Sequence, residues 1–175
     1  MYFDSFPTIP YDALGNGNPS AVTNLLRRVA VRAKVKNNTA LYDTYDVKEG
    51  ESPEMIAHKL YGDSELHWVI MLFNDVNDRY HDWPMSGNQF NAYLLDKYDN
   101  VDGIHHYEIT SESGHGTDKI DVGLTNTDYP SATAITNREY EEALQDDKRT
   151  IKLLDPRYVE DFVEEFKRLT QENVI

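Results

Sequence analysis

The stretch EGESPEMIAHKLYGDSELHWVIMLFNDV, residues 49–76, decides the fold because it encodes two short helices joined by a tight turn. Ser52 is a suitable N-cap, Pro53 is a suitable first helical residue, and Gly62 is suited to end the helix in a left-handed conformation. Ser64 or Asp63 then caps a second helix. Apolar residues recur at helical spacing in both parts. They predict a structural core made of Ile56, Leu60, Leu66, Val69, Ile70 and Phe73.

The second of these helices is apolar on two faces. Trp68, Met71 and Leu72 form a stripe beside the one that carries the predicted core residues. A helix with two apolar faces must be covered on both. The domain's own strands can cover one face. The other is left for an inserted segment of this chain or for another protein.

Composition narrows the class of protein. The chain has 175 residues, a net charge of −14 and no cysteine. Its length suggests one compact domain with extensions. The negative charge argues against nucleic acid and membranes as partners, and the lack of cysteine excludes disulfides and thiolate metal sites. With no run of membrane-spanning length and no signal-peptide pattern, we expect a soluble protein used without export.

The two chain ends carry aromatic residues that could contact a partner. Residues 1–19 are rich in proline, glycine and asparagine and show no period, which predicts an extended N-terminal arm. This arm would dock on its own domain or on a neighbour, unless it is a frayed terminus. An amphipathic helix after Asp155-Pro156 would dock on its own core or in a partner's groove. The candidate contact residues are Phe3, Phe6, Ile9 and Tyr11 in the arm, and Phe162 and Phe166 in the helix.

Residues 20–40 predict a helix followed by a strand that leads into the core. Val22, Leu25 and Leu26 follow helical spacing after Asn18-Pro19, and residues 29–36 then alternate between apolar and basic side chains. The basic cluster could seat an acidic partner or balance the chain's own acids. Its candidate interface residues are Arg28, Arg32 and Lys34.

No motif for catalysis is present. His105 and His106 are adjacent, so in a strand they should point to opposite faces. The stretches HHYE and HGTD could gather a metal site, although solvated loop histidines are the simpler interpretation. Calcium-loop, phosphate-loop and nucleophile-elbow patterns are all missing. We therefore assign no catalytic, metal-binding or cofactor-binding residue, and we expect a protein that is not an enzyme and needs no cofactor.

A resemblance to a known family adds to this interpretation. YDVKEGESPEMIAHKLYGDSELHWVIMLFN resembles a LysM module. The longer YDVKEGESPEMIAHKLYGDSELHWVIMLFNDVNDRYHDWPMS, with MYFDSFPTIPYD before it and FNAYLLDKY and KRTIKLLDPRYVEDFVEEFKRL after it, resembles the LysM-like baseplate wedge protein family of T4-type contractile-tailed bacteriophages.

The resemblance implies a structural subunit of the tail baseplate. It would bind other wedge and inner-baseplate proteins of the same phage, in six copies, and help join wedges into a six-fold ring. It would be part of the virion and occupy the host cytoplasm during assembly. The alternative is a LysM module that binds peptidoglycan or another glycan; a hydrolase lacks any motif.

A LysM fold needs a second strand, and none directly follows Asn74. We predict that residues 150–154 supply it by pairing with residues 45–48, so that the span between is an insertion. Trp83, beside a proline, would fill a pocket of its own chain or anchor a partner. The expected class is α+β. The predicted parts are an extended arm (1–19), a helix and strand (20–40), a LysM-like βααβ core (41–83), an insertion (84–148), and a closing strand with an amphipathic helix (149–175).

Overall fold

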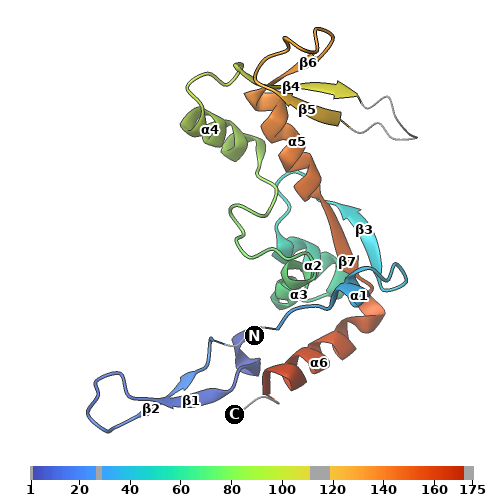
Figure 1. The fold of residues 1–175 in the computed structure, drawn as a ribbon. Coiled ribbons are helices and arrows are strands. Elements are labelled where there is room, and N and C mark those ends of the chain that lie inside the picture. Colours follow the sequence, from blue (N-terminus) through green and yellow to red (C-terminus); the bar gives the residue numbers. More distant parts are fainter. Residues whose placement is uncertain (1, 27–28, 111–118, 172–175) are drawn as a thin grey trace. The chain divides into compact units, whose positions relative to one another are not determined.

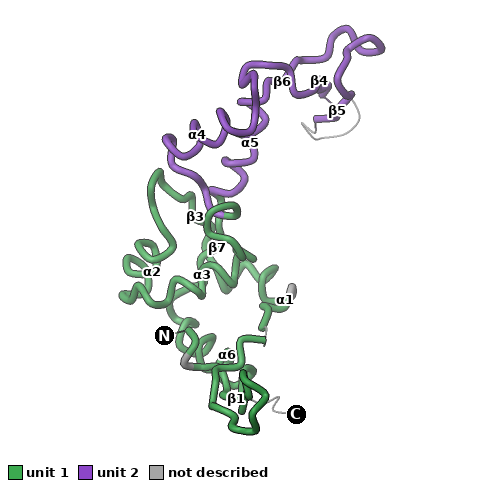
Figure 2. The backbone as a smooth tube through the Cα atoms, turned by 90° about the vertical axis from the view of Figure 1, so that its left-hand side faces the viewer, with its two compact units in different colours: residues 1–82, 150–175 green, residues 83–149 purple. Residues whose placement is uncertain are grey.

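The computed structural model describes residues 2–26, 29–110 and 119–171. The chain is α+β and divides into two compact units (Figure 2). Unit 1 comprises residues 1–82 and 150–175, and unit 2 comprises residues 83–149. The part of the chain that the structure describes has no helix long and apolar enough to cross a membrane.

The centre of unit 1 has the order strand, helix, helix, strand. These elements are β3 (Tyr42–Asp46), α2 (Pro53–Tyr61), α3 (His67–Phe73) and β7 (Thr150–Leu154). β3 and β7 pair antiparallel, with Asp43 opposite Leu153 (Figure 1). The predicted closing strand at residues 150–154 is therefore confirmed. Its partner strand begins three residues earlier than predicted, at Tyr42 rather than Tyr45.

Local signals set the ends of the two helices. The Ser52 side chain accepts a hydrogen bond from the Met55 N–H at 3.4 Å, as an N-cap does. Gly62 has a φ of 77°, which a side chain at this position would oppose. Asp63 accepts from the Glu65 N–H at 2.8 Å and starts the short turn η2 (Ser64–Leu66). Of the two predicted caps for this turn, Asp63 makes the bond.

The core of unit 1 lies between α2, α3 and β7. Val69, Ile70 and Phe73 are buried, as is Ile56 on α2. Leu60 and Leu66 are half-buried. Two hydrogen bonds link Asn74 to the backbone of Lys152 at the edge of this core. Asn74 Nδ2 donates to the Lys152 carbonyl at 2.8 Å, and the Lys152 N–H donates to Asn74 Oδ1 at 2.8 Å. The end of α3 is thereby fixed to β7.

The remaining elements of unit 1 come from the chain ends and the segment before β3. They are η1 (Tyr2–Ser5), β1 (Thr8–Tyr11), β2 (Ser20–Thr23), α1 (Ala33–Lys36), η3 (Pro156–Tyr158) and α6 (Val159–Gln171). β1 and β2 pair as an antiparallel hairpin. The amphipathic C-terminal helix is present as α6.

Two predictions for this region are wrong. The helix predicted around Val22 is strand β2, because pairing with β1 places Val22 opposite Ile9. The strand predicted over residues 29–36 is not formed; instead the Val35 N–H bonds the Arg32 carbonyl at 2.9 Å in the first turn of α1. The predicted N-terminal arm contains η1 and the first strand of the hairpin.

Unit 2 combines a three-stranded sheet with two helices. Its elements are α4 (Gly87–Lys97), β4 (Ile104–Thr110), β5 (Lys119–Gly123), β6 (Thr133–Thr136) and α5 (Asn137–Arg149), with strand order β5-β4-β6. Glu141 on α5 is 2% exposed and accepts hydrogen bonds from Lys97 Nζ and Tyr98 Oη, each at 2.7 Å. Burial alone would raise the pKa of Glu141, but these two donors lower it below 4.5.

Candidate protein interface

Among the residues that the structure describes, no group of three or more potential metal ligands gathers. The stretch HGTD, residues 115–118, lies outside them. His105 and His106 on β4 were expected on opposite faces, but their rings meet, with Nδ1 atoms 2.9 Å apart. The register of β4 against β6 shifts between Ile104 and His106, and such an irregularity re-aims a side chain. His106 Nε2 contacts Glu108 at 3.0 Å and Tyr140 stacks on His105. The pair is thus held by its own unit.

An aromatic cluster joins both chain ends to α3. It consists of Tyr2, Phe3, Phe6, Trp68, Phe162 and Phe166. The Trp68 ring lies 4.6 Å from Phe166 and 5.3 Å from Tyr2, between ring centroids. Phe166 is 2% exposed. The second apolar face of α3 is therefore covered on its Trp68 side by the N-terminal segment and α6.

A hydrogen bond fixes the same two segments to each other. Thr170 Oγ1 on α6 lies 2.8 Å from the Ser5 carbonyl oxygen and 2.8 Å from the Lys167 carbonyl oxygen of its own helix, so its single proton is shared between the two; Thr170 and Ser5 are both buried. Burial in the cluster raises the pKa of Tyr2 above its ordinary value of 10.0. The N-terminal segment up to Phe6 is consequently part of the chain's own fold.

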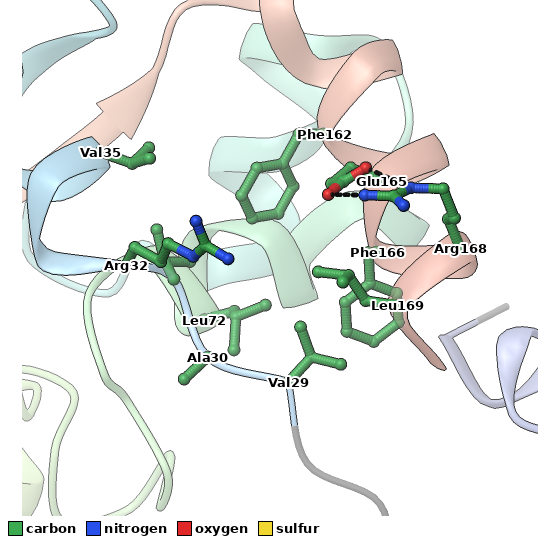
Figure 3. A pocket seen from close by; sticks show the side chains of 11 residues that line it. Val29, Ala30, Arg32, Val35, Leu72, Phe162, Glu165, Phe166, Arg168 and Leu169 are labelled. Carbon is green, nitrogen blue, oxygen red and sulfur yellow. Dashed lines mark hydrogen bonds and ion pairs between the residues drawn. The ribbon is translucent and has the colours of Figure 1, made fainter. Parts of the chain in front are cut away.

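A pocket of about 390 Å³ lies beside this cluster, between α6 and the segment before α1 (Figure 3). Leu72 and Phe162 border it together with Val29. On the α6 side, Arg168 Nε donates to a Glu165 carboxylate oxygen at 2.8 Å. Met71 and Leu72 also border two further hollows with Tyr2 and Phe3. The Met71–Leu72 part of α3 therefore faces open apolar space.

The β1–β2 hairpin and the segment that follows it expose large apolar side chains to water. The exposed fractions are 56% for Tyr11, 84% for Leu14, 61% for Leu25 and 89% for Leu26. Ile9 is half-buried. Sequence analysis missed the three leucines: Leu25 and Leu26 were assigned to a helix face, and Leu14 was not singled out in its loop.

The loop that carries Leu14 is organised around one carboxylate. Asp12 Oδ2 accepts from the Gly17 N–H at 2.7 Å, and Oδ1 accepts from the Asn16 and Leu14 N–H groups at 3.2 Å. The Gly17 bond, followed by the others, lowers the pKa of Asp12 below 3.8. Gly15 and Gly17 have positive φ, which permits this tight path. Leu14 is thus held outward by a defined loop.

The remaining candidate residues lie in different settings. Arg32 is exposed and borders the pocket. Arg28 and the side chain of Lys34 lie outside what the structure describes. Lys36, from the same basic cluster, pairs with Asp75 and so balances one of the chain's own acids. Trp83 is buried, with 5% of its surface exposed.

Comparison with known proteins decides the family. A model of the family described as Base plate wedge protein 53 matches residues 1–117. The chain belongs to this family. A curated relative, Baseplate wedge protein gp53 of Enterobacteria phage T4, is 26% identical over 145 residues, covering 74% of each chain. The Base plate wedge protein 53 family is structural, so its member described here has a structural role in the phage tail baseplate, among other baseplate proteins of the virion.

Proposed function

We propose that this protein binds neighbouring wedge and inner-baseplate subunits and helps join wedges into a six-fold ring. It acts in six copies per baseplate, is incorporated while the phage assembles in the host cytoplasm, and performs no catalysis. The observation that carries the proposal is that the β1–β2 hairpin and the segment after it expose Leu14 and Leu26 almost completely in a member of a baseplate wedge family.

The exposed leucines fit a binding role because apolar side chains in water gain free energy when a partner covers them, about 25 cal/mol per Å² buried. Single exposed apolar residues are ordinary, but several within one short stretch of chain favour an interaction site. Tyr11 and Leu14 lie on the hairpin, and Leu25 and Leu26 follow its second strand, at the opposite end from the Leu14 loop. Coverage by a neighbouring subunit explains why these side chains remain apolar.

The candidate residues divide into two groups. Phe6, Trp68, Phe162 and Phe166 contact one another or Tyr2 inside unit 1, and we assign them to the fold. Phe3, with 58% of its surface exposed, belongs to both groups. The proposed partner contacts are Phe3, Ile9, Tyr11, Arg28, Arg32, Lys34, Met71 and Leu72, to which the hairpin and the segment after it add Leu14, Leu25 and Leu26. Trp83, with 5% of its surface exposed, is assigned to the fold.

The test uses purified baseplate proteins of the same phage, each mixed with this protein and analysed by sedimentation velocity. We expect at least one to form a stoichiometric complex. The double variant Leu14→Ser/Leu26→Ser should weaken that complex by about tenfold or more, since hot-spot residues carry most of an interface's free energy. Leu95→Ser is the matched control, because Leu95 in unit 2 is 75% exposed but lies outside the hairpin.

Two outcomes would overturn the proposal. One is that no baseplate protein binds. The other is retention of the wild-type protein on purified peptidoglycan with no protein complex, which would make the LysM-type glycan module the correct function. Equal binding by the double variant would instead move the interface away from the hairpin.

A further inference from the structure

The two edges of the β1–β2 hairpin differ in their free backbone groups. The Asn24 N–H donates to the Pro7 carbonyl at 2.8 Å, which makes these two opposed residues a hydrogen-bonded pair. Bonded and non-bonded pairs alternate along an antiparallel ladder. Ile9 and Val22 are therefore bonded to each other, and the non-bonded pairs are Thr8 with Thr23 and Pro10 with Ala21. The backbone groups of these four residues point away from the hairpin.

The β1 edge is closed to another strand. Its outward positions are Thr8 and Pro10. Proline has no N–H, and proteins use it on edge strands to prevent pairing. A third strand along β1 would therefore lack a donor at Pro10, and the ring would obstruct its approach.

The β2 edge is open. Ala21 and Thr23 each keep an outward N–H and C=O, and both residues are exposed. Within the described residues, no hydrogen bond from outside the hairpin reaches these groups. The strand contains no proline and no charged side chain, the usual protections of an edge. Its backbone is thus a template for one more strand, the mode of recognition known as β-augmentation.

Charge indicates which kind of chain would occupy this edge. Residues 13–42 contain five basic residues and no acid, so their net charge is +5. Because the whole chain has −14, the remainder carries −19. Lys36 of this stretch pairs with Asp75, which leaves four basic residues. A second copy paired through β2 would bring two such basic stretches together, and like charges at an interface oppose binding. An acidic segment of another protein is attracted instead.

We propose that β2 accepts an extended, acidic segment of another baseplate protein as the third strand of the hairpin. This inference rests on the proposed function and names its mode of contact. The segment pairs its backbone with Ala21 and Thr23 and places alternate apolar side chains beside Val22. Leu25 and Leu26, which follow the strand after Asn24, hold it further. Its acids are attracted to the basic stretch, of which Arg32 is an exposed member.

The probe is a set of overlapping synthetic peptides that covers the other baseplate proteins of the same phage. Each is titrated against the full chain by fluorescence polarisation at low and high salt. We expect acidic peptides to bind best, with affinity falling as salt rises. On binding, amide hydrogen exchange at Ala21 and Thr23 should slow, while exchange at Thr8 stays unchanged.

A pair of variants isolates the edge. Ala21→Pro removes an outward N–H from β2 and should weaken peptide binding by about tenfold or more, through a lost hydrogen bond and a steric clash. Thr8→Pro makes the matching change on the β1 edge and should leave affinity within about twofold, since neither N–H belongs to the β1–β2 ladder. Thermal unfolding of both variants verifies that neither substitution unfolds the chain. The hydrogen-exchange measurement uses the wild-type protein and therefore tests the β2 edge even if a variant does not fold.

Several results would overturn the inference. Binding of Ala21→Pro equal to wild type would exclude strand addition, and preference for basic peptides would exclude the acidic segment. A self-association that Ala21→Pro abolishes would make a second copy the occupant. If folded baseplate proteins bind wild type and Ala21→Pro equally, strand addition fails and the proposed function stands. If neither peptides nor folded proteins bind, the proposed function fails as well.

Discussion

Residues 2–6 and the β1–β2 hairpin adjoin in the chain, and both carry aromatic side chains, yet these end in opposite environments. The first segment places Tyr2 and Phe6 against Trp68 and Phe166, and its Ser5 carbonyl is bound by α6. The hairpin instead exposes Tyr11 and Leu14. The presence of apolar residues alone therefore does not separate a segment that completes its own fold from one proposed to bind a partner.

The difference has a structural cause. The N-terminal turn lies against two helices whose apolar faces need covering, and every ring it buries there contributes to the stability of the monomer. The hairpin bonds mainly to itself, and an isolated two-stranded hairpin buries little. We propose that stability and binding are assigned to neighbouring segments, and four variants test this division.

Trp68→Ala should have the largest effect, because Trp68 lies at the centre of the aromatic cluster. Loss of a fully buried aromatic side chain costs about 3–5 kcal/mol in the free energy of unfolding, and the half-buried Trp68 should reach the lower end, about 3 kcal/mol. Urea denaturation measures it, with Tyr11→Ala in the hairpin as the control, expected within about 0.5 kcal/mol of wild type. A Trp68→Ala protein that unfolds like wild type would show that the ring serves an interface.

Thr170→Val should have the next largest effect. The variant keeps the side chain's shape but leaves the buried Ser5 carbonyl without its 2.8 Å donor, a loss of about 1–2 kcal/mol. The exposed Thr23→Val is the control. Faster hydrogen exchange at the Phe6 N–H, which bonds the Phe3 carbonyl, should accompany the loss; unchanged exchange would contradict the role of Thr170 in holding η1.

The pH dependence of stability gives a smaller effect. Burial raises the folded-state pKa of Tyr2, so the folded chain holds this proton more tightly than the unfolded chain. The resulting stability is present below pH 10.0 and decreases as the pH rises above it. Tyr2→Phe should therefore lose less stability between neutral pH and pH 11 than wild type does. Parallel curves for the two proteins would place Tyr2 outside the cluster.

Leu14→Ser should have the smallest effect on folding, within about 0.5 kcal/mol, because the side chain is almost fully in water. Its loop is held by Asp12 and two glycines, which the substitution leaves in place. Thermal unfolding in parallel with Leu95→Ser measures this. A large drop in melting temperature for Leu14→Ser alone would mean that the hairpin is part of the fold.

Sequence reasoning succeeded where the signal is local. Ser52, Pro53 and Gly62 fix α2 through nearest neighbours, and the missing partner of the first strand pointed to residues 150–154. It failed at Val22. The spacing of the apolar residues there fits a helix, and only pairing with β1, which the local sequence does not reveal, makes the segment a strand. It also could not tell whether Phe166 serves the fold or a partner, since the bond between Thr170 and Ser5 spans 165 positions.

The most direct test of this division is amide hydrogen exchange measured by mass spectrometry on the free protein and on assembled baseplates. We predict that residues 2–6 are protected in the free protein and change little on assembly, whereas residues 8–26 exchange fast when free and become protected. Fast exchange of residues 2–6 in the free protein, with protection only on assembly, would contradict the account and assign both segments to binding.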